Sequence, residues 1–149
     1  MDTSTAPATP TGPRVTLWVL RTVSVLLLLA VLAQPVLAGL YLSGEWDALG
    51  LHSGNAVLVE SLSFFLLLAA LAYWLAGRGR GRVALAATLL FIAAVMQSGF
   101  GYARQLGLHI PLGVAVVTAS VVFTVWVCRA GARTPRRPWW GSVRTGGAR

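Results

Sequence analysis

Four long apolar stretches, separated by short polar segments, constrain the fold of this chain more than any other feature. Each stretch holds about 20 residues or more, the length with which an α-helix crosses a hydrocarbon core of about 30 Å. The chain has 56% hydrophobic and 11% charged residues, whereas soluble domains carry about 25% charged residues. The sequence therefore predicts an all-α membrane protein, with spans at about 22–42, 50–76, 83–102 and 109–128.

The segments outside these spans are rich in residues that disfavour regular structure. Residues 1–13 are rich in Thr, Ala and Pro and are predicted to form a disordered tail. The basic segment 129–149 is predicted to be a second disordered tail, so that residues 14–128 form the folded bundle. Pro35 is expected to kink the first span without ending it, and Pro111 is expected in the first turn of the fourth, where a missing N–H costs little.

The distribution of arginines predicts how the spans are oriented. The net charge of +8 comes from twelve Arg and no Lys against four acids. Arginines precede the first span, separate the second from the third and follow the fourth, whereas the opposite side has only Arg104 against Glu45 and Asp47. The positive-inside rule then predicts a multi-pass plasma-membrane protein with both termini cytoplasmic. The basic charge is attributed to this topology and to anionic lipids, not to nucleic-acid binding.

The first span has one alternative interpretation. Residues 14–38 combine a basic start, a Leu-rich centre and a small-residue end, as a secretory signal does. The apolar run is longer than a usual signal core, and Gln34-Pro35 interrupts its end, which favours a retained helix. Cleavage would leave the topology of the remaining spans unchanged.

The only two histidines of the chain close a repeated word, Leu-Gly-Leu-His, at His52 and His109. Superposing the two words aligns the second span with the fourth. The first and third spans then carry Gln34 and Gln97 near their outer ends, although this match needs a gap. The pattern predicts an up-down four-helix bundle built from two repeated helical hairpins, related by an axis along the membrane normal.

In such a bundle the second and fourth helices are diagonal partners, so His52 and His109 are expected to face each other at similar depth. Two imidazoles so placed can hold a metal from opposite sides, and haem iron held by histidine between helices is a known use of a bundle. A zinc or copper site needs three or four ligands, and the lone Cys128 is at the far end of its helix. The hypothesis is a haem b with both histidines as axial ligands.

Several other residues at this level are candidates for the same site. Gln34 and Gln97 could hydrogen-bond toward a cofactor or across the bundle as structural contacts. Arg104 could pair with a haem propionate, with a loop acid or with lipid phosphate. Small residues could leave space for a porphyrin or allow close helix packing; they are Gly39, Gly54, Gly99, Gly101 and Gly113.

Glu60 is the one acid inside a predicted span. It lies eight residues past His52, which places it roughly 12 Å deeper in a helix. It could relay protons, contact a quinol or haem edge, or be a neutral side chain bonded to a neighbouring helix, with Ser61, Ser63 or Tyr73 as partners.

The order of these features resembles one four-helix half of the haem A synthase family. The segments that carry the resemblance run from Met96-Gln97-Ser98-Gly99 to Leu108-His109, within a match over about residues 20–128. The chain is also similar to small uncharacterised actinobacterial four-span proteins with two histidines. The family uses two such halves and an outer loop with an acid and often a cysteine pair; here Glu45 matches the acid and the cysteines are absent. The resemblance thus implies haem b binding, with electron transfer or haem handling, more than haem modification.

Two other functions remain open on the sequence. One is a cofactor-free structural or accessory subunit of a membrane complex, in which the histidines make structural contacts. The other is a proton-coupled carrier that uses Glu60, for which four short spans would favour a homo-oligomer. The expected partners are the lipid bilayer and, for the haem hypothesis, a membrane redox partner or a quinone.

Overall fold

The computed structural model describes residues 14–133. The predicted tail 1–13 and the part of the predicted tail from residue 134 onward lie outside the described residues. Four long helices follow one another, joined by short connections, and a short 3-10 turn follows the last helix. They are α1 (Arg14–Leu42), α2 (Ala48–Leu75), α3 (Gly81–Tyr102), α4 (Leu106–Cys128) and η1 (Ala130–Arg133).

The four predicted helices are confirmed, and each one extends beyond the start of its predicted span. Every helix begins earlier than predicted, by eight residues in α1 and by two or three in the others. Pro111 therefore lies beyond the first turn of α4, and α1 continues through Pro35 to Leu42. The start of the predicted disordered tail is also wrong, because residues 130–133 form η1.

The four helices are long and apolar enough to cross a membrane, consistent with the predicted multi-pass membrane protein. Their surfaces agree with this, because large apolar side chains remain exposed along all four helices, among them Leu29, Leu58, Leu89 and Val122. Only 22–33% of each apolar span is buried inside the bundle. A hydrocarbon environment is the one in which such surfaces are stable.

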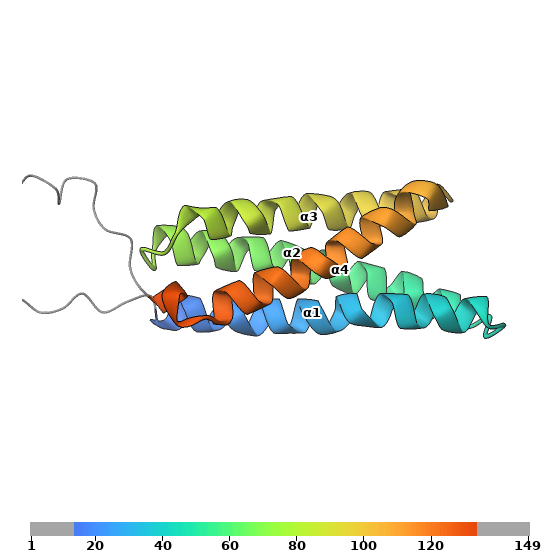
Figure 1. The fold of residues 1–149 in the computed structure, drawn as a ribbon, viewed down its shortest axis with the longest axis horizontal. Coiled ribbons are helices and arrows are strands. Elements are labelled where there is room, and N and C mark those ends of the chain that lie inside the picture. Colours follow the sequence, from blue (N-terminus) through green and yellow to red (C-terminus); the bar gives the residue numbers. More distant parts are fainter. Residues whose placement is uncertain (1–13, 134–149) are drawn as a thin grey trace, which may run out of the picture.

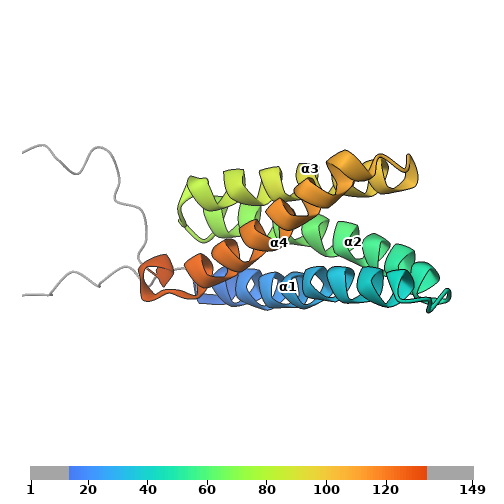
Figure 2. The ribbon, with the colours of Figure 1, turned by 45° about the vertical axis from the view of Figure 1, so that its right-hand side comes forward.

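The helices form an up-down bundle in which α1 and α3, and likewise α2 and α4, are diagonal (Figure 1). Residues 14 and 133 lie at one end, called the terminal end, and the connections 43–47 and 103–105 lie at the other, called the histidine end. α4 crosses from α1 at the terminal end to α3 at the histidine end, and the turned view shows the same course (Figure 2). α4 is therefore the neighbour of α1 at the terminal end and the neighbour of α3 at the histidine end.

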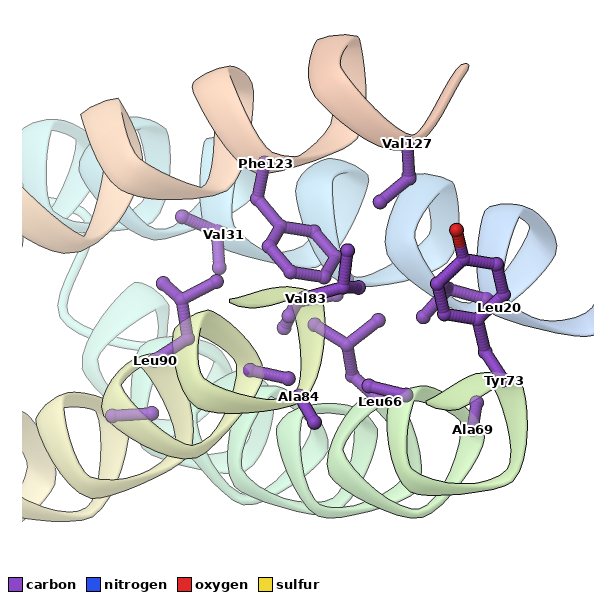
Figure 3. Close-up of a cluster of buried hydrophobic side chains, with 14 of the residues drawn as sticks. Leu20, Val31, Leu66, Ala69, Tyr73, Val83, Ala84, Leu90, Phe123 and Val127 are labelled. Atoms are coloured by element: carbon purple, nitrogen blue, oxygen red, sulfur yellow. The ribbon is translucent and has the colours of Figure 1, made fainter. Parts of the chain in front are cut away.

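The closest packing is in the half of the bundle toward the terminal end. The largest fully buried side chains there include Leu20, Leu66, Tyr73 and Val127, which come from α1, α2 and α4 (Figure 3). Tyr73 is fully buried, and its hydroxyl donates to the carbonyl of Ala132 in η1 at 2.9 Å. η1 thus closes the bundle over this core.

Arg21 is a buried cation at the terminal end, with 6% of its surface exposed. Its guanidinium donates to the carbonyls of Val127, Cys128 and Arg129 at 2.9, 3.2 and 3.3 Å. The last carbonyls of a helix have no partner within the helix and carry the negative end of its dipole, so a cation there is stabilising. The sequence had suggested only a topological role for Arg21, whereas the structure shows that it caps α4.

Candidate functional site

The two histidines face each other across the diagonal of the bundle, as predicted. His52 lies four residues into α2 and His109 three residues into α4, and both are half-buried. Their ring centroids are 6.2 Å apart, with an angle of 65° between the ring planes. The structure therefore brings together two imidazoles that are far apart in the chain.

His109 is held by the helix that precedes it. Its Nδ1 lies 2.8 Å from the backbone carbonyl oxygen of Gln97 in α3. A carbonyl can only accept, so Nδ1 donates its proton and Nε2 keeps a free lone pair. A backbone carbonyl on the second nitrogen is also the usual support of a histidine that binds a metal.

The side chain of Gln97 lies over that free lone pair. Its amide nitrogen is 3.5 Å from Nε2 of His109, at the long end of a hydrogen bond. Its amide oxygen is buried, and no donor within residues 14–133 reaches it. The amide thus makes one weak contact and leaves its acceptor unsatisfied, which is a costly arrangement.

His52 is held by Gln34 of α1 through two competing contacts. The backbone carbonyl of Gln34 lies 3.2 Å from Nδ1 of His52. In the amide orientation that satisfies its neighbours, the Gln34 side chain donates to the same Nδ1 at 3.0 Å and to the His52 carbonyl at 3.2 Å, and accepts from the N–H of Ala56 at 3.1 Å. The first contact needs a proton on Nδ1, and the second needs Nδ1 bare.

A cavity of about 350 Å³ lies between the helices at this level, within the size range of small-ligand sites. Its walls are mostly apolar, and all four helices contribute to them. His52, His109, Gln34 and Gln97 all line it, so their polar groups converge in an apolar space. Tyr41, Leu42, Tyr102 and Leu106 line it toward the histidine end.

Two of the five glycines predicted at this level lie in close contact with side chains of the site. A Cβ on Gly101 would lie 2.9 Å from the His109 ring, and a Cβ on Gly113 would lie 2.7 Å from the Gln97 amide nitrogen. At Gly39, Gly54 and Gly99 a Cβ would meet nothing within 4 Å. Gly101 and Gly113 therefore provide space for the histidine and its neighbouring amide.

The structure does not bring Arg104 or Glu60 to the cavity. Arg104 is exposed in the turn between α3 and α4, with φ 56°, and is not among the lining residues. Glu60 is half-buried on α2 and also lies outside the lining. Its expected partners donate elsewhere, to backbone carbonyls: Ser61 to Val57, Ser63 to Glu60 and Tyr73 to Ala132.

Asn55 belongs to the same region and was not predicted from the sequence. Its side chain donates to the carbonyl of Ala30 at 2.8 Å and so joins α2 to α1. It lies three residues after His52, on a neighbouring part of the same helix face. The spacing of three residues from His52 is the sequence feature that could have predicted the position of Asn55.

Comparison with known proteins adds no identity to this description. No family model, curated protein or solved structure matches the chain. The fold and the site define a class of protein, a four-helix bundle suited to a membrane with a histidine pair at one end.

Proposed function

We propose that this protein binds haem b between His52 and His109 in the plasma membrane. The observation that carries the proposal is the pair of facing imidazoles with ring centroids 6.2 Å apart. Two nitrogen–metal bonds of about 2 Å each account for about 4 Å of that separation, and the distances from ring centres to nitrogens account for the rest. The separation would suit one metal ion between the rings if one nitrogen of each imidazole is directed at it.

The donor set favours a metal that brings its other ligands with it. Within the described residues, no group of three or more His, Cys, Asp or Glu side chains is placed to hold an ion. A tetrahedral zinc site needs four ligands. In a haem, the porphyrin supplies four of the iron's ligands, so the protein has to supply only two. The apolar cavity around the pair and the space left by Gly101 and Gly113 support the same choice.

The finer architecture belongs to the same proposal. The parallel contacts of His52 with Gln34 and of His109 with Gln97 support two repeated hairpins, and the arginine distribution supports cytoplasmic termini. The resemblance to one half of the haem A synthase family fits this arrangement. When bound, the haem supplies a one-electron couple, and a quinone or membrane redox partner would exchange the electrons. The exposed Arg104 would meet a propionate only at the rim.

The absorption spectrum of the purified full-length chain tests this function. Protein produced with ample haem should show the Soret band of a six-coordinate haem, and His52→Ala or His109→Ala should lose that spectrum. Glu60→Gln is the matched control, because Glu60 lies outside the cavity and its replacement should leave the band unchanged. A colourless wild-type protein that also takes up no added hemin would overturn the proposal.

A second function is favoured by one observation. Both histidines already have hydrogen-bond partners in the chain itself, as expected for structural residues of a cofactor-free accessory subunit. In that case His52→Ala and His109→Ala would lower stability without any spectral change. The carrier hypothesis is less supported, because Glu60 does not line the cavity.

A further inference from the structure

We infer that the side-chain amides of Gln34 and Gln97 gate the histidine pair, holding both imidazoles in a state that cannot bind a metal until the amides move. The inference rests on the proposed function for the nature of the ligand, but its geometry concerns the free protein. Neither glutamine is then a ligand. Both are positioning residues that decide when the ligands become available.

At His109 the gate is the Gln97 amide, which occupies the lone pair that a metal would bind. The carbonyl of Gln97 fixes the proton on Nδ1 at 2.8 Å, so Nε2 is the only nitrogen that can bind a metal. The Gln97 amide nitrogen lies 3.5 Å from that atom and uses the same lone pair. A lone pair that accepts this hydrogen bond cannot also bind iron at about 2 Å, so the amide must leave first.

Two features make the movement of the Gln97 amide easy. Its hydrogen bond is long, and its oxygen is buried without a donor within the described chain, so little is lost when it turns away. Gly113 provides the space that the amide occupies, since any Cβ there would lie 2.7 Å from the amide nitrogen. A Cβ at residue 113 would therefore displace the amide from its position beside His109.

At His52 the gate is the choice of tautomer, that is, which of the two ring nitrogens carries the proton. The Gln34 amide makes three contacts with α2, one of them as a donor to Nδ1 of His52. With Nδ1 accepting, a neutral imidazole carries its proton on Nε2 and has no free lone pair there. The Gln34 carbonyl, 3.2 Å from the same Nδ1, is placed to support the opposite tautomer, which leaves Nε2 bare. Ligation at His52 therefore requires the side-chain contact to be exchanged for the backbone contact.

Histidine nitrogen NMR of the haem-free, full-length protein in nanodiscs tests the gate without any ligand. The expected result is two different tautomers, with the proton on Nδ1 in His109 and on Nε2 in His52. Gln34→Leu should convert His52 to the Nδ1–H tautomer and leave His109 unchanged. Finding both histidines already in the Nδ1–H form in the wild type would overturn the gate at His52.

Hemin uptake measured by stopped flow tests the consequence. Gln97→Leu should bind hemin faster than the wild type by at most about fivefold, the factor that corresponds to one ordinary neutral hydrogen bond, because the contact at 3.5 Å is longer than an ordinary one. Gly113→Ala should have the same direction of effect, because it displaces the amide while keeping it in the chain. Gly54→Ala, where a Cβ meets nothing, is the control and should leave the rate unchanged.

The outcomes separate the two proposals. Uptake that is slower in both Gln97→Leu and Gly113→Ala would overturn the gate at His109 while leaving haem binding intact. A wild-type protein that takes up no hemin would overturn the proposed function, and the tautomer measurement would still decide whether Gln34 controls His52. If Gln97→Leu does not fold, Gly113→Ala tests the same contact.

Discussion

The two ends of this bundle are built in opposite ways. At the terminal end the hydrogen bonds connect the two hairpins. Arg21 of α1 donates to the carbonyl of Val127 in α4, the hydroxyl of Thr124 in α4 donates to the carbonyl of Ser24 in α1, and Tyr73 of α2 donates to the carbonyl of Ala132 in η1. At the histidine end, the side-chain hydrogen bonds found in the described chain stay within a hairpin, α1 with α2 or α3 with α4. The facing rings and the apolar cavity lie between the hairpins there.

This difference shows how a small membrane protein can be stable and still keep a binding site that opens. Regions that move are drawn from the least stable part of a structure, whereas a site needs rigid support for its ligands. Here each histidine is fixed within its own hairpin, and the hairpins are joined at the opposite end. A ligand between the histidines would need the hairpins to separate only where, among residues 14–133, no side-chain hydrogen bond joins them.

The largest expected effect is at Arg21. Arg21→Met keeps the length of the side chain but leaves three carbonyls at the end of α4 without their charged donor, which should lower the unfolding free energy by about 3 kcal/mol. Unfolding by denaturing detergent measures this loss. Arg129→Met is the control, because that side chain is exposed. If Asn55→Ala at the histidine end costs as much as Arg21→Met, the proposed contrast between the ends is wrong.

The sequence allowed the helices and the histidine pair to be predicted because both depend on order along the chain. Long apolar runs define the spans, and short connections make α2 and α4 diagonal. With both histidines near the starts of parallel helices, equal depth follows. Depth and order were therefore accessible without coordinates.

Which side of each helix faces inward was not accessible, and for one physical reason. A helix in lipid is apolar on every face, so no polar stripe indicates its rotation. Arg21 could therefore be assigned to topology but not to the end of α4. For the same reason Gly101 and Gly113, which adjoin the site, could not be told from Gly54, which meets nothing.

A pair of matched glycine substitutions gives the next largest effect. Gly79 is buried at the terminal end, and a Cβ there would overlap the ring of Tyr73. Gly79→Ala should cost about 2 kcal/mol, because a buried ring bonded to η1 has little freedom to shift. Gly54→Ala, in open space toward the histidine end, should be neutral or stabilise by up to about 1 kcal/mol. Equal thermal midpoints for the two variants in detergent would contradict the contrast.

The smallest expected effect is also the most specific, because it removes a single oxygen atom. Tyr73→Phe keeps the buried ring but deletes the hydroxyl that donates to Ala132, which should lower the unfolding free energy by about 1 kcal/mol. Tyr102→Phe makes the same change at the histidine end, where the side chain is 68% exposed, and should have no measurable effect. A loss confined to Tyr73→Phe, with hemin uptake unchanged in that variant, would show that η1 stabilises the terminal end independently of the histidine site. Equal losses would mean that the hydroxyl of Tyr102 stabilises the histidine end as much as that of Tyr73 stabilises the terminal end, which would contradict the contrast between the ends.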